Sequence, residues 1–575
     1  MKKGIKNILI LLLSLTLFSC SDSFLDTKPL DKYSEADVWS DANIAQAFIY
    51  DIYGDIMVEL VKNPLGINGA PGTRSDDYSD NIATRRNNVV KKDQLDRNFD
   101  AGWDVFHIIR KCNLAIEKVT ESSEITEALK VELIAQAKML RAMIYYSRAR
   151  LFGKYIIIER VLTEEDDFKL PRSSTIKETY DFILSDLQDA AEGLPEVAPA
   201  GQLTRGAALA YLAEVALHGA AYIESGKSEY YQVSKKASED LFALGYSLDS
   251  DYRGLTSDYG SAIGSSEVIL GYFRHVDNTE FRLTPMQRIV PNCSEPKNFD
   301  WVVPKLSESF EGWAEVWPSQ ELVDDYLVVD QDGDAKKWDE TSYYQDFLDN
   351  GGYVSDAIYK NRDARFYTSI VHDSSQFYGN LVTIRKGGNM HWESNASGNW
   401  SMTRTGYYFR KSVFEGQKLW ARDNVPFHHL MARLGRSYLN YSEVMLRLND
   451  PATALQYINM TRSAHGQLPE LSTGLSLDDA WKYYRIERRV ELFYENDRYW
   501  SLLRWGKEAG DIIIPELNKG LKAIEIATDG RSFELVDLPL DATTNEAVFS
   551  TRKYLFPVPE PQRLLNENLD QNPGW

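Results

Sequence analysis

Apolar residues recur along most of this chain at intervals of three and four positions, the spacing of an amphipathic helix face. The helical stretches fall into four pairs. They span residues 43–60 with 103–119, 127–152 with 176–194, 204–223 with 229–244, and 430–448 with 451–462. Because each apolar face must be covered by a neighbour, the pattern predicts helix hairpins packed together. The last two pairs are similar to tetratricopeptide hairpins, although no strict repeat period runs along the chain.

Residues 484–505 contain neither Pro nor Gly, so this segment is predicted to form one helix. At helical spacing, a stripe of alternating charge runs along one face. It consists of Arg488, Glu491, Glu495 and Arg498. The stripe has two interpretations: a site for an anion or a carboxylate, or ion pairs that lock the helix in place. Paired charges normally satisfy each other, which favours the structural interpretation.

Two connections, over residues 61–100 and 245–429, are too long to be simple turns. Loops of this length usually carry function. The longer connection is rich in aromatic residues, Gly and Pro, and short strands are expected at 267–273, 381–385 and 406–411. The predicted fold is therefore mostly α: a scaffold of helix hairpins with a long, loop-rich insert that contains short strands.

Composition narrows the class of ligand. The net charge of −21 argues against a nucleic-acid partner, which requires clustered Lys and Arg. Aromatic residues reach 12%, with 13 Trp and 33 Tyr, which is more flat apolar surface than a core requires. We therefore expect aromatic rings at the surface of the protein.

The N-terminus has the features of an export signal. A basic start precedes an apolar run over residues 8–18, which is too short to span a bilayer. A small residue then directly precedes Cys20, which resembles the bacterial lipobox. We expect residues 1–19 to be removed as a signal peptide and Cys20 to be acylated, leaving 20–575 as a single domain. An ordinary secretory signal with an incidental Cys is the alternative.

The two remaining cysteines differ in their surroundings. Cys112 lies on an apolar stripe with the spacing of a helix, which is typical of a buried core thiol. Cys293 lies in a loop flanked by Pro. A disulfide between Cys112 and Cys293 is the less favoured alternative.

Several segments resemble, in chain order, motifs of the SusD/RagB family. The first to stand out is IERRVELFYENDRY at residues 486–499, followed by LLRW. The complete set is 137–153, 170–195, 318–326 with 361–366, 486–505 and 554–575. Ala364 stands where the family pattern has Pro. Most of these motifs are structural in the family, so they bear on the scaffold more than on the ligand.

The resemblance implies a SusD-like fold with four tetratricopeptide-like hairpins. It also implies a lipoprotein of Bacteroidota, anchored through Cys20 to the outer membrane and exposed at the cell surface. Such proteins capture nutrients for a SusC/RagA-like TonB-dependent transporter, on which they sit as a lid. We therefore expect this protein to bind a glycan and to deliver it to such a transporter. Capture of peptides by the same mechanism is an alternative, which basic and hydrophobic grooves would favour.

Signatures of chemistry are missing from the sequence: HExxH, a phosphate loop, GxSxG and CxxC do not occur. We expect no enzymatic activity, cofactor or metal. A glycoside hydrolase stays an alternative, because its pair of carboxylates has no fixed spacing in sequence. Residues 330–334, DQDGD, resemble the start of a calcium loop, but Thr341 stands where the closing Glu belongs. An Asp/Gly turn is the favoured interpretation, with a bound cation as the alternative.

A sugar site needs flat aromatic rings beside short polar side chains. Both long loops offer this combination, and in the family the ligand contacts come from loops placed like these. The candidate ligand-binding residues are Arg74, Asp76, Asp77, Tyr78, Trp301, Trp313 and Trp317. Each Trp has the alternative role of an anchor packed inward. Trp392 and Trp400 lie in a Gly/Asn/Ser-rich loop and rank behind.

Overall fold

The computed structural model describes residues 35–61, 75–85, 88–292, 310–394, 402–415, 417, 419–538 and 546–575. Several sequence-based predictions fall outside these ranges. They concern residues 1–34, Arg74, Cys293, Trp301 and Trp400. The acylation of Cys20 therefore stays a prediction, and the less favoured alternative of a Cys112–Cys293 disulfide stays untested.

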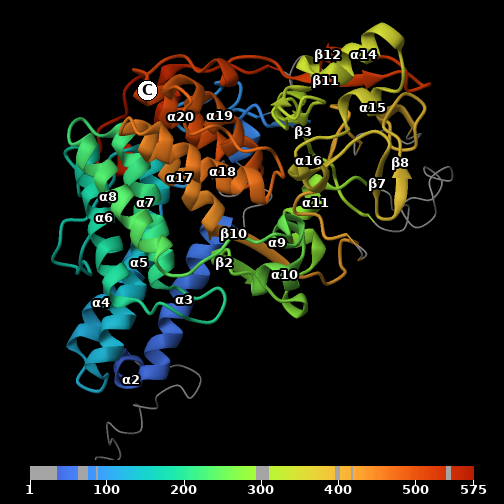
Figure 1. The fold of residues 1–575 in the computed structure, drawn as a ribbon. Helices are drawn as coiled ribbons and strands as arrows, with labels where there is room; N and C mark the ends of the chain where they lie inside the picture. Colours follow the sequence, from blue (N-terminus) through green and yellow to red (C-terminus); the bar gives the residue numbers. More distant parts are fainter. Residues whose placement is uncertain are drawn as a thin grey trace, which may run out of the picture.

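The four predicted helix pairs are confirmed, and the helices of each pair pack against each other. They are α3 (Ala42–Val61) with α4 (Phe106–Glu121), α5 (Glu127–Phe152) with α6 (Ile176–Gly193), α7 (Arg205–Tyr222) with α8 (Lys227–Phe242), and α17 (Leu434–Arg447) with α18 (Pro451–Ala464). Figure 1 shows α4 to α8 side by side, with α17 to α20 stacked beyond them. The mostly α fold is thus confirmed.

Local sequence signals set where several helices begin. The hydroxyls of Thr175 and Thr204 accept hydrogen bonds from backbone N–H groups in the first turns of α6 and α7. Asp450 does the same for α18, whose first residue is Pro451. These N-caps satisfy donors that a helix start otherwise leaves without partners. The hairpin scaffold therefore rests on signals that lie within each segment.

The helix predicted over residues 430–448 begins later than expected. Its first residues belong to β10 (Phe427–Arg433), which pairs antiparallel with β2 (Val268–Arg274). Burial alternates along the middle of β10, from His428 to Ala432, and the strand pairs with β2, so the strand forms there in place of the helix. The predicted strand at 267–273 is confirmed as β2.

The helix predicted over residues 484–505 is divided in two. The first part, α19 (Leu477–Glu491), ends before a six-residue break, and α20 (Arg498–Glu508) begins after it. Tyr494 and Asn496 both have a φ of 60°, which no right-handed helix accommodates. The backbone N–H of Asn496 donates to a carboxylate oxygen of Asp76 at 3.0 Å. Contacts with a distant loop therefore hold the break open.

The insert is built from short elements around a second apolar core. Its elements are α9 (Tyr252–Ser257), α10 (Tyr259–Gly264), α11 (Met286–Ile289), β3 (Val316–Pro318), α13 (Gln320–Val323), β4 (Val328–Val329), β5 (Ala335–Lys336), α14 (Ser342–Asn350), α15 (Val354–Ile358), α16 (Ala364–Ser369), β6 (Ile370–Val371), β7 (Ser375–Phe377), β8 (Asn380–Val382) and β9 (Tyr408–Phe409). The strands expected at 381–385 and 406–411 are present as the shorter β8 and β9, each in a two-stranded pair with β7 or β6.

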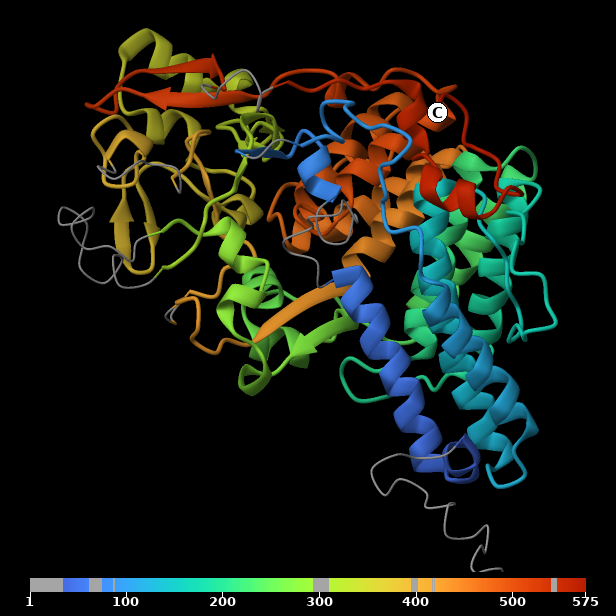
Figure 2. The same ribbon diagram turned by 180° about the vertical axis from the view of Figure 1, so that it is seen from behind.

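The C-terminal part of the chain returns to the insert. β11 (Lys522–Ile526) and β12 (Phe533–Asp537) form a hairpin whose Ile524 and Ile526 join the insert core. Figure 2 shows the C-terminal chain running along one edge of the molecule between the insert and the helical scaffold. The remaining α-helices and strands of the described residues are α2 (Glu35–Ser40), β1 (Ile82–Thr84) and α22 (Glu560–Leu565). Sequence periodicity did not predict the β11–β12 hairpin.

Cys112 is fully buried in α4, as its apolar stripe predicted. Burial raises the pKa of its thiol to about 12, so the thiol is inert at neutral pH. No helix in the described ranges is both long and apolar enough to cross a membrane.

Candidate functional site

The structure brings the two predicted ligand-binding loops together. β1 follows the first set of candidates and pairs antiparallel with β3, so that Ala83 lies opposite Trp317. Arg288 links the two loops, because its guanidinium binds Asp77 at 2.7 Å and Glu315 at 3.4 Å. The two loops therefore form one rigid unit, as a shared site requires.

Most of the candidate side chains in this unit point inward, which a surface stacking platform does not allow; for Trp317 the alternative of an inward-packed anchor is confirmed. Asp76, Asp77, Tyr78 and Trp317 are 0%, 6%, 7% and 1% exposed, respectively. Trp317 packs in a small core with Ala83, because the β1–β3 pairing turns its ring away from solvent. Tyr78 packs edge-on against Tyr499, with their ring centres 5.4 Å apart. Neither ring offers an open face to a sugar.

Asp76 of this loop holds the α19–α20 break, whereas Asp77 binds Arg288. Asp76 accepts hydrogen bonds from the N–H of Asn496 at 3.0 Å and from the side-chain amide of Asn81 at 3.3 Å. Burial raises the pKa of Asp76 to about 7, although both hydrogen bonds oppose the shift. The partners of Asp76 are therefore residues that maintain the fold. The break that Asp76 binds is also the feature that the sequence periodicity did not predict.

Trp313 is the candidate that the structure leaves partly exposed. Four consecutive backbone N–H groups, from residue 312 to residue 315, donate to carbonyls between residues 287 and 291 at 2.7–3.1 Å. Gly312 sits so close to the carbonyl of Val290 that a Cβ there would lie 2.1 Å from its oxygen. The backbone that carries Trp313 is therefore rigid, and a stacking ring placed on it costs little conformational entropy on binding.

A second partly exposed ring lies elsewhere in the insert. The guanidinium of Arg404 lies 4.1 Å from the ring centre of Trp392, which begins a short 3-10 helix. The sequence analysis ranked Trp392 behind Trp313 as a candidate for a ligand contact. The guanidinium of Arg404 also covers part of the Trp392 ring. Trp313 is therefore the stronger candidate for a stacking contact.

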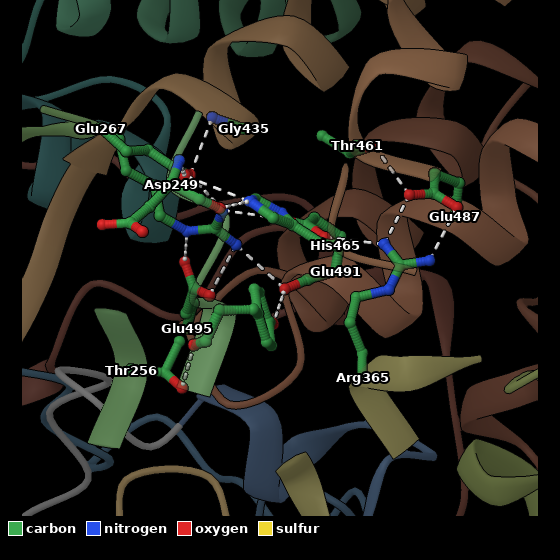
Figure 3. Close-up of polar contacts among 12 residues, drawn as sticks. Asp249, Thr256, Glu267, Arg365, Gly435, Thr461, His465, Glu487, Glu491 and Glu495 are labelled. Carbon is green, nitrogen blue, oxygen red and sulfur yellow. Dashed lines mark hydrogen bonds and ion pairs between the residues drawn. The ribbon is translucent and has the colours of Figure 1, made fainter. Parts of the chain in front are cut away.

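A buried ion cluster lies where α19 meets the insert and β10 (Figure 3). Arg433 binds Glu267 at 2.8 Å, Glu491 at 2.6 Å and Glu495 at 2.8 Å, and all four side chains are almost fully buried. Arg365 from the insert binds Glu491 at 2.7 Å. The cluster therefore joins the helical scaffold to the insert through ion pairs.

The charged stripe of residues 484–505 thus forms ion pairs that hold the segment in place, although the partners in these pairs differ from those expected. Its members pair with residues from other elements and not along one helix face. Arg488 binds Asp497 at 2.6 Å, and Arg498 binds Asp80 at 2.9 Å. The alternative of a site for an anion on the stripe is not supported, because each of its arginines already has a carboxylate partner.

The geometry of Glu267, His465 and Glu491 superficially suits a metal ion. His465 Nδ1 lies 2.8 Å from Glu491, and Nε2 lies 3.2 Å from Glu267. Burial alone would lower the pKa of His465, but the two carboxylates raise it to about 10, so the ring is an imidazolium. A metal requires a neutral imidazole, and Arg433 already occupies the carboxylates. These residues do not fit a metal.

The DQDGD segment forms the expected Asp/Gly turn. The backbone N–H of Asp330 donates to the carbonyl of Asp334 at 2.9 Å, and Gly333 has a φ of 89°. The ammonium of Lys336 binds Asp330 at 2.9 Å and also contacts Asp332. A side-chain cation therefore already neutralises these carboxylates, which argues against the alternative of a bound ion.

The architecture defines a class of protein: helix hairpins that carry a loop-rich insert, joined to it by buried ion pairs. Comparison with known proteins agrees. A family model described as "SusD family" matches residues 267–575, and one described as "Starch-binding associating with outer membrane" matches residues 23–217. The chain belongs to the SusD/RagB family.

The chain resembles its relatives over nearly its whole length. It is 22% identical to a SusD-like protein of Bacteroides ovatus, over 88% of this chain and 83% of that protein. It is 23% identical to SusD-like protein P2 of Formosa agariphila, over 98% of each chain.

Solved structures show the same fold. A SusD-like protein from Bacteroides fragilis matches with a TM-score of 0.74 at 25% identity, over 96% of this chain and 100% of that one. A SusD-like carbohydrate binding protein from the same species matches with a TM-score of 0.72 at 20% identity, over 92% and 99%. A laminarin binding SusD-like protein matches with a TM-score of 0.61 at 18% identity, over 93% and 99%.

Proposed function

We propose that this protein captures a glycan at the outer surface of the cell and passes it, uncut, to a SusC/RagA-like TonB-dependent transporter. Family membership supports this proposal, since similar proteins are described as carbohydrate binding and laminarin binding. The single observation of this chain that carries it is Trp313, a partly exposed ring on a rigid backbone. Such a ring suits the flat C–H face of a sugar.

The transporter part of the proposal rests on the family and on the shape of the scaffold. The hairpins α3–α4 and α5–α6 present a broad helical surface at the opposite end of the molecule from β11 and β12 (Figure 1). A lid needs a rigid face on which to dock, and packed helix pairs supply one. The description of the matching N-terminal family model also names association with the outer membrane.

Trp313→Ala is expected to weaken glycan binding by roughly tenfold, because a stacked ring contributes about 0.5–1.5 kcal/mol beyond the area it buries. Titration calorimetry of the full chain against laminarin, starch and other glycans of defined linkage measures the effect. Trp481→Ala is the matched control, since Trp481 is also partly exposed but lies on α19, where it stacks with Arg447. Unchanged binding in a folded Trp313→Ala variant would remove this ring from the site.

Cys20→Ala is expected to release the protein from the membrane fraction. Several acyl chains, at about 0.8 kcal/mol per buried methylene, make an anchor that does not dissociate. Fractionation of cells that express the wild type or the variant, followed by mass spectrometry of the mature N-terminus, checks this. A variant that still sediments with outer membranes would show that another element anchors the chain.

A further inference from the structure

A groove lined with aromatic rings lies where α3 and α5 meet β2, and Trp313 is not part of it. Its remaining wall is the loop of residues 198–203, which connects α6 to α7. The groove measures about 230 Å³, less than the roughly 300–1,000 Å³ of a site for a drug-sized ligand. Its lining includes four aromatic rings, one carboxylate and one amide, from Tyr50, Tyr53, Tyr272, Phe273, Glu132 and Gln136.

Tyr50 is the most exposed of the four rings. It keeps 49% of its surface exposed, whereas Ile49 and Ile52 on the same helix are buried in the core. The other three rings are partly exposed. Part of the aromatic surface in this groove is therefore available to a ligand.

The walls of the groove are held in place by the protein itself. The hydroxyl of Tyr53 on α3 donates to the carbonyl of Gly201, which ties the 198–203 loop to the helix. Gly201 has a φ of 85°, a conformation that favours glycine. The ring of Phe273 folds over Gly271, where a Cβ would lie 2.4 Å from a carbon of that ring. Because this surface is formed in advance, binding costs little conformational entropy.

A carboxylate without a cationic partner lines the same groove. Glu132 is partly exposed, and one of its oxygens accepts a hydrogen bond from the side-chain amide of Gln136 at 3.2 Å. Lys130, two residues away, binds Glu127 instead, at 2.8 Å. In the part of the chain that the structure describes, no Lys, Arg or His lies at ion-pair distance from Glu132. Its second oxygen can therefore accept hydrogen bonds from the hydroxyls of a ligand.

We propose that this groove binds a neutral sugar ring of the captured glycan, as a second contact site apart from Trp313. A pyranose offers flat C–H faces to the aromatic rings and hydroxyl donors to Glu132. An anionic sugar would be repelled by this carboxylate. Two contact sites raise the affinity for a glycan that reaches both. This inference rests on the proposed function and adds a second site to it.

Titration calorimetry of the full chain with neutral glycans of defined linkage, laminarin and starch included, tests the inference. Tyr50→Ala is expected to weaken binding by roughly two- to tenfold, the effect of one lost stacking contact. Glu132→Gln is expected to weaken it by a few fold, because a neutral acceptor forms a weaker hydrogen bond than a carboxylate. Tyr353→Ala is the matched control, since Tyr353 is 46% exposed but lies in the insert, outside the groove.

Tyr50→Phe keeps a ring in place and is expected to bind like the wild type. Glu132→Gln serves as the test if Tyr50→Ala folds poorly.

The pattern across the variants separates this inference from the proposed function. Unchanged binding in both Tyr50→Ala and Glu132→Gln, with weaker binding in Trp313→Ala, would overturn the groove site and leave glycan capture intact. Weaker binding in the groove variants alone would keep the groove and remove Trp313 from the site. Tighter binding of glucosamine than of glucose, lost in Glu132→Gln, would show an ammonium site and overturn the assignment to a neutral sugar. Binding of no glycan by the wild type would contradict both proposals.

Discussion

Replacing Arg433 with Met is expected to destabilise the protein by about 3–5 kcal/mol, because breaking a buried ion pair leaves an uncompensated charge in the interior. Arg433 has no exposed surface and serves three carboxylates, of Glu267, Glu491 and Glu495. Its loss would leave these acids facing one another with fewer counter-charges. The variant is therefore expected to unfold at a much lower urea concentration or to fail to accumulate as a folded protein.

Urea unfolding followed by circular dichroism measures the effect, with Arg205→Met as the control. Arg205 pairs with Glu196 at 2.8 Å, but both side chains are at least 40% exposed. Exposed pairs contribute less than about 1 kcal/mol. A similar small effect for Arg433→Met would contradict the role of the cluster as the link between the scaffold and the insert.

The free energy of unfolding is expected to fall as the pH rises from about 6.5 to about 10, because of His465. Glu491 and Glu267 outweigh the effect of burial and raise the pKa of His465 to about 10 in the folded protein. An unfolded His has a pKa of about 6.5. The folded state therefore binds the proton more tightly, so this stabilisation is complete below pH 6.5 and is lost as the pH approaches 10. The slope for one proton is at most about 1.4 kcal/mol per pH unit.

The comparison with His465→Gln isolates this contribution. Burial raises the pKa of Asp76 to about 7, and burial lowers the pKa of both Lys91 and Lys553 to about 8, so other groups also titrate near this window. They are present in both proteins and cancel in the difference. The stability gap between the wild type and the variant should narrow steadily over pH 6.5–10, as followed by urea unfolding. A gap that is independent of pH would mean that His465 is neutral in the folded protein.

The helix hairpins could be predicted because their signals are local. Thr175, Thr204 and Asp450 cap helices within their own segments, and each helix has a periodic apolar face. The resemblance to the family motifs then predicted the fold of the whole chain. Fold class therefore followed from the sequence with few errors.

The break between α19 and α20 could not be predicted, because its causes are far away in the chain. Within residues 492–497, Leu492 and Glu495 favour a helix. However, Asn496 binds Asp76, and Glu495 binds Arg433 and Lys411. These contacts compensate for the lost helical hydrogen bonds. Propensity counts only neighbours, so tertiary contacts overrode it.

The candidate site was predicted only in part, for a similar reason. The sequence places Trp313 and Trp317 in the same loop, and both were equally ranked candidates for a contact with the ligand. The β1–β3 pairing decides between them, because it buries Trp317 and leaves Trp313 partly exposed.

The most direct test of glycan capture without cleavage follows the fate of the glycan. The full-length protein is incubated with end-labelled laminarin, starch and a uronic-acid-containing glycan, and bound material is separated, released and sized by mass spectrometry. We expect at least one glycan to be retained and recovered at its original length, with retention reduced in Trp313→Ala. Recovery of shortened chains would contradict capture without cleavage, and retention of none of the panel would contradict glycan capture itself.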